Sequence, residues 1–328
     1  MAKSFEKYAK RGSDNSDRRL RLFDFVVDRK YDDPPLYSGQ PALVGYPFDI
    51  GVGRNNGRVG AKEGPEALRK ALANLAWQGS SMVADLGDII SGQGEIFADS
   101  KYFDLKDEVE SSQAALYSTV LAAINGGYFP VVLGGGHDLA AATTLAATVF
   151  SATENKSCAI LNFDAHFDLR RQSRANSGTG FLQAYEINKK MSLDNYHYTA
   201  VGIAETSNTQ LLFETAASIG AKFLIDRKVD VSGRNFVDDI IKNFDSIYVS
   251  VDLDSIELSS MKAVSAPAAY GIALRTIEEL LSSLVESHKV IGVDFAEFNP
   301  RLDDDSTSSR VAARLIHTIL STQTSGIN

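Results

Sequence analysis

Cysteine is nearly absent from this chain of 328 residues. Because Cys158 is the single cysteine, no disulfide can form within the chain, and a reducing compartment is expected. Its surroundings, CAILNF, indicate a buried small hydrophobic side chain. Long apolar runs are lacking too: none approaches the roughly 20 residues that cross a membrane, and the first residues show no secretory signal. We therefore expect a cytoplasmic protein without a membrane-spanning segment.

Positive charge is also in short supply. The 33 Lys and Arg residues are outnumbered by 42 Asp and Glu residues, which gives a formal net charge of −9 and a pI of about 5.1. A net negative charge disfavours binding to nucleic acid or to an anionic membrane surface. Nucleic acid and membrane are therefore not expected as partners, and a cytosolic enzyme is the default expectation.

The chain lacks the usual phosphate-binding loops. Its glycine-rich stretch 51–65, GVGRNNGRVGAKEGP, matches neither GxxxxGK[ST] nor GxGxxG. Two interpretations are left: a flexible loop before a helix that begins near residue 64, or a substrate-binding loop. In the second, Arg54 and Arg58 would hold carboxylates bidentately.

Short apolar runs alternate with helix-like stretches after residue 40. Runs rich in Val, Ile and Leu are typical of buried parallel strands. Eight such runs lie near residues 42–46, 82–86, 129–133, 158–163, 199–203, 222–226, 246–251 and 290–295. Helix-like stretches include 64–76, 138–150, 208–219, 275–287 and 307–322. This alternation predicts one α/β domain built on an eight-stranded parallel sheet.

The first 40 residues differ from the rest of the chain. They are polar and charged, and they contain Pro34 and Pro35. No composition break or repeat divides the remainder. We therefore expect an N-terminal arm at 1–40 and a single catalytic domain at 41–328.

Three segments carry side chains that bind metals, and each follows an apolar run directly. Ligands gather at the carboxyl ends of parallel strands, so these side chains are expected to meet in space. The segments are GGGHD with His137, NFDAHFD with Asp164, His166 and Asp168, and SVDLD with Asp252 and Asp254.

Spacing and ligand type both favour a pair of metal ions. Residues at i, i+2 and i+4 of an extended segment share one face, but alternate residues lie roughly 6.6 Å apart. Either a bent strand end or two metals would let all of them act as ligands. Four carboxylates and two imidazoles form an oxygen-rich set that favours manganese over thiolate-bound zinc. Paired metals about 3.5–4 Å apart turn a water into a nucleophile near neutral pH, which predicts a hydrolase with two Mn²⁺ per chain.

Taken singly, these residues have ordinary structural explanations. Asp138, beside His137, could cap the helix that follows, and Asp252 or Asp254 could be a turn residue. The combination of the three segments is what favours a metal site over these explanations.

Together with GVDFAEFNP at 292–300, the three motifs resemble the ureohydrolase family, which includes arginase, agmatinase and formimidoylglutamase. The resemblance covers roughly residues 40–320. It implies an arginase-like, three-layer α-β-α fold with an eight-stranded parallel sheet. It also implies two manganese ions and hydrolysis of a C–N bond in a guanidinium or amidine group.

The family also implies how the residues divide their roles. Glu297 would hold the cationic C–N group, and Asp168 would help to move a proton. One metal would be bound by His137, Asp164, Asp168 and Asp252, and the other by His166, Asp164, Asp252 and Asp254, with Asp164 and Asp252 bridging.

Several segments resemble the formimidoylglutamase branch of the family. Arginases usually read GGDHS at the first motif and place a proton-shuttling His soon after DAHxD. This chain reads GGGHD and has no His within 169–196. N-formimidoyl-L-glutamate carries two carboxylates, which fits a rim supplied by Arg54, Arg58, Arg170 and Arg171. The candidates for binding its glutamate carboxylates are Arg170, Asn176, Ser177 and Gly178.

The expected reaction is hydrolysis of N-formimidoyl-L-glutamate to L-glutamate and formamide, in histidine breakdown. Two departures from the family pattern, the missing DP after DLD and MKAVSAP in place of APGVSAP, could alter the loop beside the metals. The alternatives are arginase, agmatinase or guanidino-acid hydrolase, a single-metal amidohydrolase or deacetylase, and a non-catalytic subunit or binding protein. Family members often form homo-oligomers, and an oligomer is possible here by analogy.

Overall fold

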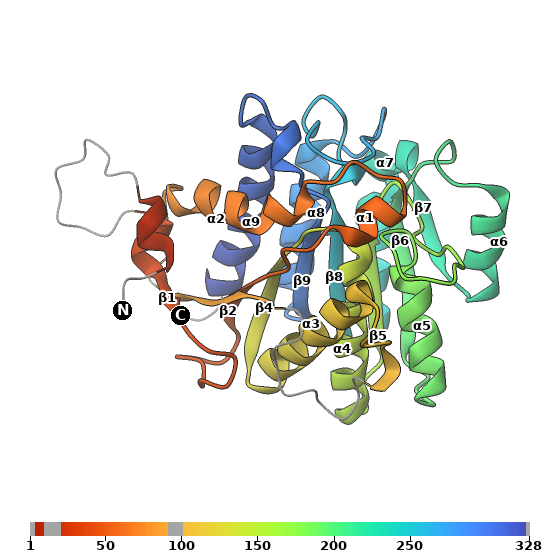
Figure 1. Cartoon of the computed structure of the whole chain (residues 1–328), viewed down its shortest axis with the longest axis horizontal. Helices are drawn as coiled ribbons and strands as arrows, with labels where there is room; N and C mark the ends of the chain where they lie inside the picture. The colour runs from red at the N-terminus through yellow and green to blue at the C-terminus, as the bar shows by residue number, and fades with distance from the viewer. Residues whose placement is uncertain (1–3, 10–20, 80, 91–100, 326–328) are drawn as a thin grey trace.

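The computed structural model describes residues 4–9, 21–79, 81–90 and 101–325. Its strands form one sheet in which every neighbouring pair is parallel, in the order β1-β3-β2-β4-β9-β8-β5-β6-β7 (Figure 1). The strands are β1 (Val26–Asp28), β2 (Gln40–Gly45), β3 (Val83–Asp88), β4 (Tyr128–Leu133), β5 (Cys158–Phe163), β6 (Tyr196–Ile203), β7 (Lys222–Ile225), β8 (Ser246–Asp252) and β9 (Val290–Ala296).

Helices cover both faces of this sheet. They are α1 (Ile50–Arg54), α2 (Gly64–Ala73), α3 (Glu108–Asn125), α4 (Ala140–Thr153), α5 (Gly180–Lys190), α6 (Gln210–Ser218), α7 (Val229–Asn243), α8 (Leu274–Glu286) and α9 (Thr307–Ser325). The predicted three-layer α/β fold is therefore confirmed. Within the described residues, no helix combines the length and apolar character that crossing a bilayer requires.

All eight predicted strands are present, but the sheet has a ninth. The extra strand, β1, pairs with β3 at one edge, with Val26 opposite Val83. Sequence patterning missed it because three residues are too few to show a period. β1 lies within the segment expected to be an arm, and Phe5 and Leu22 from the same segment are buried in the main core. A division of the chain at residue 40 stays a prediction.

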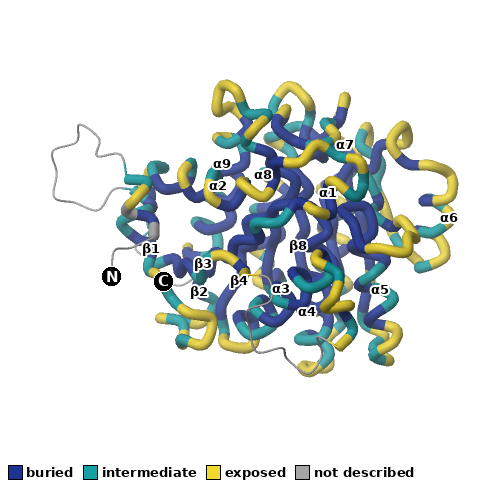
Figure 2. The backbone as a smooth tube through the Cα atoms, viewed as in Figure 1, coloured by how far each residue is buried: buried dark blue, intermediate teal, exposed yellow. Residues whose placement is uncertain are grey.

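Two hydrophobic cores lie on opposite faces of the sheet. One packs against α2, α7, α8 and α9, and the other against α3, α4 and α5. Successive residues of β8 alternate between them: Val249 and Val251 face the first core and Tyr248 faces the second. Central strands such as β4 and β8 are accordingly buried along their whole length (Figure 2), whereas β7 at the edge of the sheet has no buried residue. This double coverage explains why their sequences are almost continuously apolar.

The chain reverses its direction of sheet building near the middle. β5, β6 and β7 extend one half of the sheet, whereas β4 borders the other half, and β9 and β8 fill the space between. The carboxyl ends of β4, β9, β8 and β5 therefore lie side by side. A reversal of this kind opens a ligand crevice at the carboxyl ends of the strands.

A buried ion pair fastens α2 to the sheet. The Arg69 guanidinium donates to both carboxylate oxygens of Asp85, at 3.1 and 2.9 Å, and to Asp88 Oδ1 at 2.5 Å. The Arg69 side chain is only 6% exposed and that of Asp85 only 1%. Such a pair is costly to break, because the remaining charge stays buried without its partner.

We expect Arg69→Met to destabilise the fold by about 3–5 kcal/mol, since it leaves the buried Asp85 carboxylate without the guanidinium. Arg301→Met is a matched control, because its partner Glu63 is about half exposed and such pairs contribute only about 0–1 kcal/mol. The free energy of unfolding from urea denaturation measures both. Equal effects for the two variants would contradict the assignment.

Candidate metal centre

Four adjacent strand ends deliver the predicted ligands to one place. His137 follows β4, Asp164 follows β5, and Asp252 ends β8. Glu297 directly follows β9, which lies between β4 and β8. The tertiary structure thus brings together side chains that are up to 160 residues apart in the chain.

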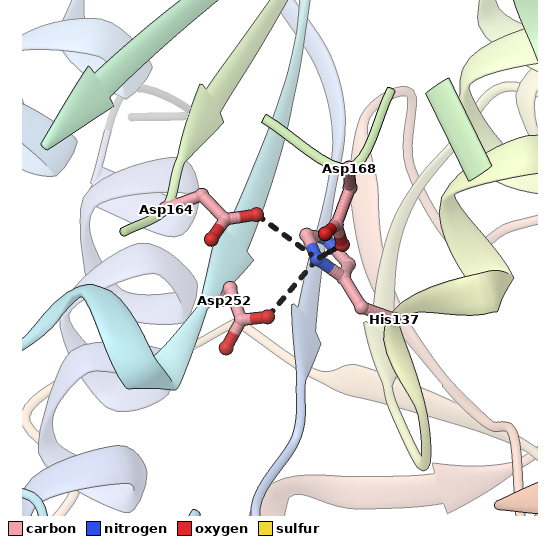
Figure 3. Close-up of side chains that lie close together, drawn as sticks. All are labelled: His137, Asp164, Asp168 and Asp252. Atoms are coloured by element: carbon pink, nitrogen blue, oxygen red, sulfur yellow. Dashed lines mark ion pairs between the residues drawn. The ribbon is translucent and has the colours of Figure 1, made fainter. Parts of the chain in front are cut away.

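His137 is the centre of the first ligand cluster. Its Nδ1 lies 3.2 Å from Asp164 Oδ2, 3.0 Å from Asp168 Oδ2 and 3.0 Å from Asp252 Oδ2 (Figure 3). All four residues are buried, and one ligand atom from each can be chosen so that all lie within 4.8 Å of one another. One ring nitrogen facing three carboxylates has the form of a metal site.

The other ring nitrogen of His137 fixes the tautomer. Ser250 donates its hydroxyl proton to Asp294 Oδ1 at 2.5 Å. Its oxygen can therefore only accept from His137 Nε2, which lies 3.0 Å away. Thr143 donates to the second Asp294 oxygen at 2.7 Å and holds that carboxylate in place. Nδ1 consequently points its lone pair at the three carboxylates, which is the arrangement of a metal-ligating imidazole.

The electrostatics of the cluster call for added positive charge. Burial lowers the pKa of His137, but Asp252 and the other carboxylates outweigh it and raise the pKa well above its usual value. Burial and the neighbouring Asp254 raise the pKa of Asp252 well above its usual range. Buried carboxylates this close together stay ionised when cations lie between them.

The second cluster shares Asp164 with the first. His166 Nδ1 lies 3.5 Å from Asp164 Oδ1 and 3.1 Å from Asp254 Oδ2. Asp164 thus offers Oδ2 to one cluster and Oδ1 to the other, as a bridging ligand must. The remaining oxygen of Asp252, Oδ1, accepts the backbone N–H of Asp254 at 2.8 Å, and the second role expected for Asp252 stays a prediction.

The same turn shapes both Asp-containing motifs. Asp164 Oδ1 accepts the N–H of His166 at 2.7 Å, just as Asp252 Oδ1 accepts that of Asp254. An Asp side chain that bonds the backbone two residues on makes an Asx turn, which bends the strand end. This bend brings side chains at i and i+2 closer than an extended segment allows. Bent strand ends and two ligand clusters therefore occur together here.

Two site residues have unusual backbone conformations. Asp168 has φ of 49° and Glu297 has φ of 68°, in the left-handed region that non-glycine residues rarely adopt. Such strain persists only where surrounding structure enforces it, and it concentrates at functional sites. At both positions the backbone conformation is unfavourable in itself, which indicates that the placement of the side chain in the site determines it.

Glu297 is anchored by one oxygen and open at the other. Its Oε1 accepts the backbone N–H of His137 at 2.9 Å. Among the described residues, Oε2 has no hydrogen-bond partner, and the same holds for His137 Nδ1 and Asp254 Oδ1. Burial raises the pKa of Glu297 to about 8. Buried polar atoms without partners are rare, so these three indicate groups that a bound metal or substrate completes.

The three glycines of GGGHD serve close packing at this point. A Cβ on Gly135 would lie 2.0 Å from the Phe48 carbonyl oxygen, and one on Gly134 would lie 2.5 Å from that of Phe295. The Gly135 carbonyl also accepts the N–H of Glu297 at 2.8 Å. Glycine is thus required here because β4, β9 and the segment after β2 crowd together at this point.

Two of the arginines predicted to bind substrate are already engaged. Arg54 Nη1 lies 2.6 Å from Asp107 Oδ1 and also donates to the Ala175 carbonyl at 3.1 Å. Arg58 donates to the carbonyls of Ser265 and Val264 at 3.1 and 2.6 Å. Either arginine would have to break these hydrogen bonds before its guanidinium could bind a substrate carboxylate bidentately.

Arg170 is differently placed. Within the described residues, its guanidinium has no hydrogen-bond or ion-pair partner. Its Cδ and Nε lie 2.9 and 3.0 Å from where a Gly178 Cβ would be, so Gly178 leaves room for this side chain. The backbone N–H of Arg170 donates to the Gly178 carbonyl at 2.9 Å. Arg170 and Gly178 are therefore adjacent, as a shared binding role requires.

Asn176 and Ser177 hold the shape of the same loop. Asn176 is buried, and its Oδ1 accepts the N–H of Gly178 at 2.9 Å. Ser177 Oγ accepts from Asn55 Nδ2 at 3.1 Å. Asn55 was missed by sequence reasoning, although it lies in the stretch 51–65 that was singled out as a binding loop.

Ser250 and Asp294 were missed as well. A signal was available: each is a polar residue within an apolar strand. Ser250 precedes Asp252 by two residues, which puts both on one face of β8. The sequence does not show that Ser250 and Asp294 bond each other, because that contact joins two strands.

Comparison with known proteins identifies the family. The sequence profile of the arginase family matches residues 40–321. This chain belongs to the arginase family. A formimidoylglutamase of Chromobacterium violaceum is 39% identical to it over 281 residues, which are 84% of this chain and 85% of that protein.

Solved structures agree with the family assignment at the level of the fold. The structure of formimidoylglutamase from Bacillus subtilis superimposes with a TM-score of 0.77 and 22% identity, covering 97% of this chain and 98% of that one. Formiminoglutamase of Trypanosoma cruzi, solved with Mn²⁺, gives a TM-score of 0.77 at 23% identity, covering 93% and 98%. The arginase-family fold of this chain is thereby established.

For this arginase-family chain we expect Asp164→Ala to remove both metal ions, because Asp164 offers one oxygen to each cluster. Asp254→Ala should remove one ion, since Asp254 belongs to the second cluster alone. Metal analysis of manganese-supplied protein measures both. Retention of one full equivalent by Asp164→Ala would contradict the bridging role.

Ser250→Ala should weaken manganese binding about 10- to 100-fold, because the imidazole loses the bond that orients it. Ser246→Ala is the matched control: it removes a buried hydroxyl at the other end of β8, where it contacts Ser151. A metal titration followed by calorimetry distinguishes the two. Equal affinities in both variants would show that the bond does not matter.

Proposed function

We propose that this chain is a manganese-dependent hydrolase that converts N-formimidoyl-L-glutamate and water to L-glutamate and formamide, in histidine breakdown. The observation that carries the proposal is a two-cluster site with Asp164 shared, in a chain 38–40% identical to several formimidoylglutamases. The formiminoglutamase structure solved with Mn²⁺ supports the choice of metal.

The residues present fit two dications. Four carboxylates balance four positive charges, and two imidazoles complete an oxygen-rich donor set that suits manganese. The first ion would be held by His137, Asp164, Asp168 and Asp252, and the second by Asp164, His166 and Asp254, with Asp252 as the further bridging ligand. When bound, such a pair lowers the pKa of a water so that it can act as a nucleophile near neutral pH.

We assign recognition of the amidine to Glu297. Its Oε1 is fixed by the His137 N–H, so the carboxylate cannot rotate freely, and Oε2 is left to accept from an N–H of the substrate. A cationic formimino group close to this carboxylate favours its ionised form over the protonated form that burial favours. The ion pair that results would orient the C–N bond to be cleaved.

Asp168 is our candidate for proton transfer. Burial, together with the charge of Asp164, raises the pKa of Asp168 to about 6. Cations bound beside Asp168 would lower this pKa again and keep the carboxylate ionised, so that one of its oxygens could accept a proton from the attacking water and pass it to the leaving amine. The stretch 169–196 contains no histidine that could do this instead.

The glutamate carboxylates would bind at the loop after Asp168. The Arg170 guanidinium has no partner among the described residues, and Gly178 lies beside it, with Ser177 next in the same loop. A guanidinium holds a carboxylate bidentately, which gives direction as well as charge. Arg54 and Arg58 would contribute mainly by holding neighbouring backbone, given the bonds they already make.

The substrate is tested by turnover with manganese on a panel of N-formimidoyl-L-glutamate, arginine, agmatine and a guanidino acid. We expect the highest kcat/KM for N-formimidoyl-L-glutamate, because it alone combines an amidine with the two carboxylates that Arg170 and its loop can receive. Faster release of urea from arginine or agmatine would reject this assignment in favour of another arginase-family activity.

Glu297→Gln should keep both metals but lower kcat/KM at least about 100-fold, because a neutral amide cannot pair with a cationic amidine and loses about 3 kcal/mol. Metal analysis run beside the kinetics shows whether the metals are kept. Unchanged kinetics with full metal content would remove Glu297 from the site.

A further inference from the structure

The segment 169–179 carries the residues proposed to bind the substrate carboxylates, yet it has no helix or strand. Residues 170–174, in its first half, are exposed, whereas 175–179 are buried. Because the exposed part buries little apolar area, polar contacts with neighbouring elements must offset the entropy that it loses on ordering. What holds it therefore bears directly on substrate binding.

Contacts with α1 secure one part of the segment. The Ser177 N–H donates to the Gly51 carbonyl at 3.2 Å, and Asn55 donates to Ser177 Oγ. Arg54, at the end of α1, donates to the Ala175 carbonyl at 3.1 Å. α1 and Asn55, which follows it, thus bond to the segment at Ala175 and Ser177.

Asp107, at the start of α3, also contacts α1 and the segment. It precedes α3, and its Oδ1 accepts the N–H groups of Val109 and Glu110 as the helix N-cap. The same Oδ1 pairs with Arg54 at 2.6 Å, and Oδ2 pairs with Arg174 at 3.0 Å. One carboxylate therefore connects α3, α1 and the exposed part of the segment.

The two ion pairs differ in strength. The side chains of Asp107 and Arg54 are 11% and 15% exposed, so solvent screens their attraction little. The Arg174 side chain is 65% exposed, and such a pair contributes about 0–1 kcal/mol. Arg54 in turn donates to the Ala175 carbonyl, so the placement of its side chain affects the backbone of the segment. We therefore expect the buried Asp107–Arg54 pair to contribute more to holding the segment than the exposed Asp107–Arg174 pair.

We propose that Asp107 is a positioning residue that holds segment 169–179 in its substrate-binding form through Arg54 and Arg174. Its hydrogen bonds and ion pairs reach none of the candidate metal ligands, so Asp107 should affect substrate affinity rather than the rate of the chemical step. The effect on affinity rests on the proposed function, whereas the effect on the segment itself does not.

Asp107→Asn separates this role from helix capping. Asparagine caps a helix about as well as aspartate, so α3 keeps its N-cap while both ion pairs are lost. If the segment is then in its binding form about a tenth of the time, the KM for N-formimidoyl-L-glutamate rises about tenfold, with kcat within about twofold of wild type.

Trypsin provides a readout that does not depend on activity. The segment contains Arg170, Arg171 and Arg174, after which trypsin cleaves once the backbone is accessible. We expect manganese-loaded Asp107→Asn to be cleaved there at least about tenfold faster than wild type, as mass spectrometry of the fragments would show. A raised KM without faster cleavage would overturn the proposal, and so would wild-type values of both.

Glu186→Gln is the matched control. It removes the same charge and breaks the exposed pair with Arg171 on the same segment, but leaves Asp107 untouched. Its KM and cleavage rate should equal those of wild type, and a change as large as that of Asp107→Asn would overturn the proposal. Should Asp107→Asn fail to fold, Arg54→Gln tests the same buried pair with both readouts. Wild-type protein that does not hydrolyse N-formimidoyl-L-glutamate would reject the proposed function, while the cleavage rates would still decide the role of Asp107.

Discussion

Negative charge buried at one edge of the sheet governs how this protein is built. Asp164, Asp168, Asp252 and Asp254 crowd around two imidazoles at the carboxyl edge of the sheet, and all are largely removed from water. Carboxylates so placed repel one another and lose their hydration. Two cations resolve both problems at once, so the pocket is built for a charge that the chain itself does not supply.

The parallel sheet makes this crowding possible. Neighbouring strands end at one edge, and β4, β9, β8 and β5 are neighbours only because the chain reverses its direction of sheet building. Asx turns then bend the ends of β5 and β8, and positive φ values aim Asp168 and Glu297. Hydrogen bonds from His137 to Ser250 and from Ser250 to Asp294 determine the direction in which the lone pair of the His137 imidazole points.

The residues proposed to distinguish substrates are held in place differently from the candidate metal ligands. The candidate metal ligands lie at strand ends that the two cores hold in place, whereas the candidate carboxylate-binding residues lie on an irregular segment held by polar contacts. Arg54 and Arg58, which the sequence offered as substrate ligands, bond to protein groups. The charged residues of a sequence indicate which ligands the edge of a site could bind. A guanidinium that already bonds to protein groups is not free to bind a ligand.

The sequence predicts the eight longer strands, the fold class and a set of residues of metal-binding type, because periodicity and strand-end motifs are local properties of the chain. It did not reveal β1, which is too short to show a period. Tertiary contacts set which side chains share a candidate ligand cluster, that Ser250 bonds His137, and that Asp107 joins Arg54 and Arg174. Each of these is a contact between segments far apart in the chain, and such contacts exist only once the strands have taken their places in the sheet.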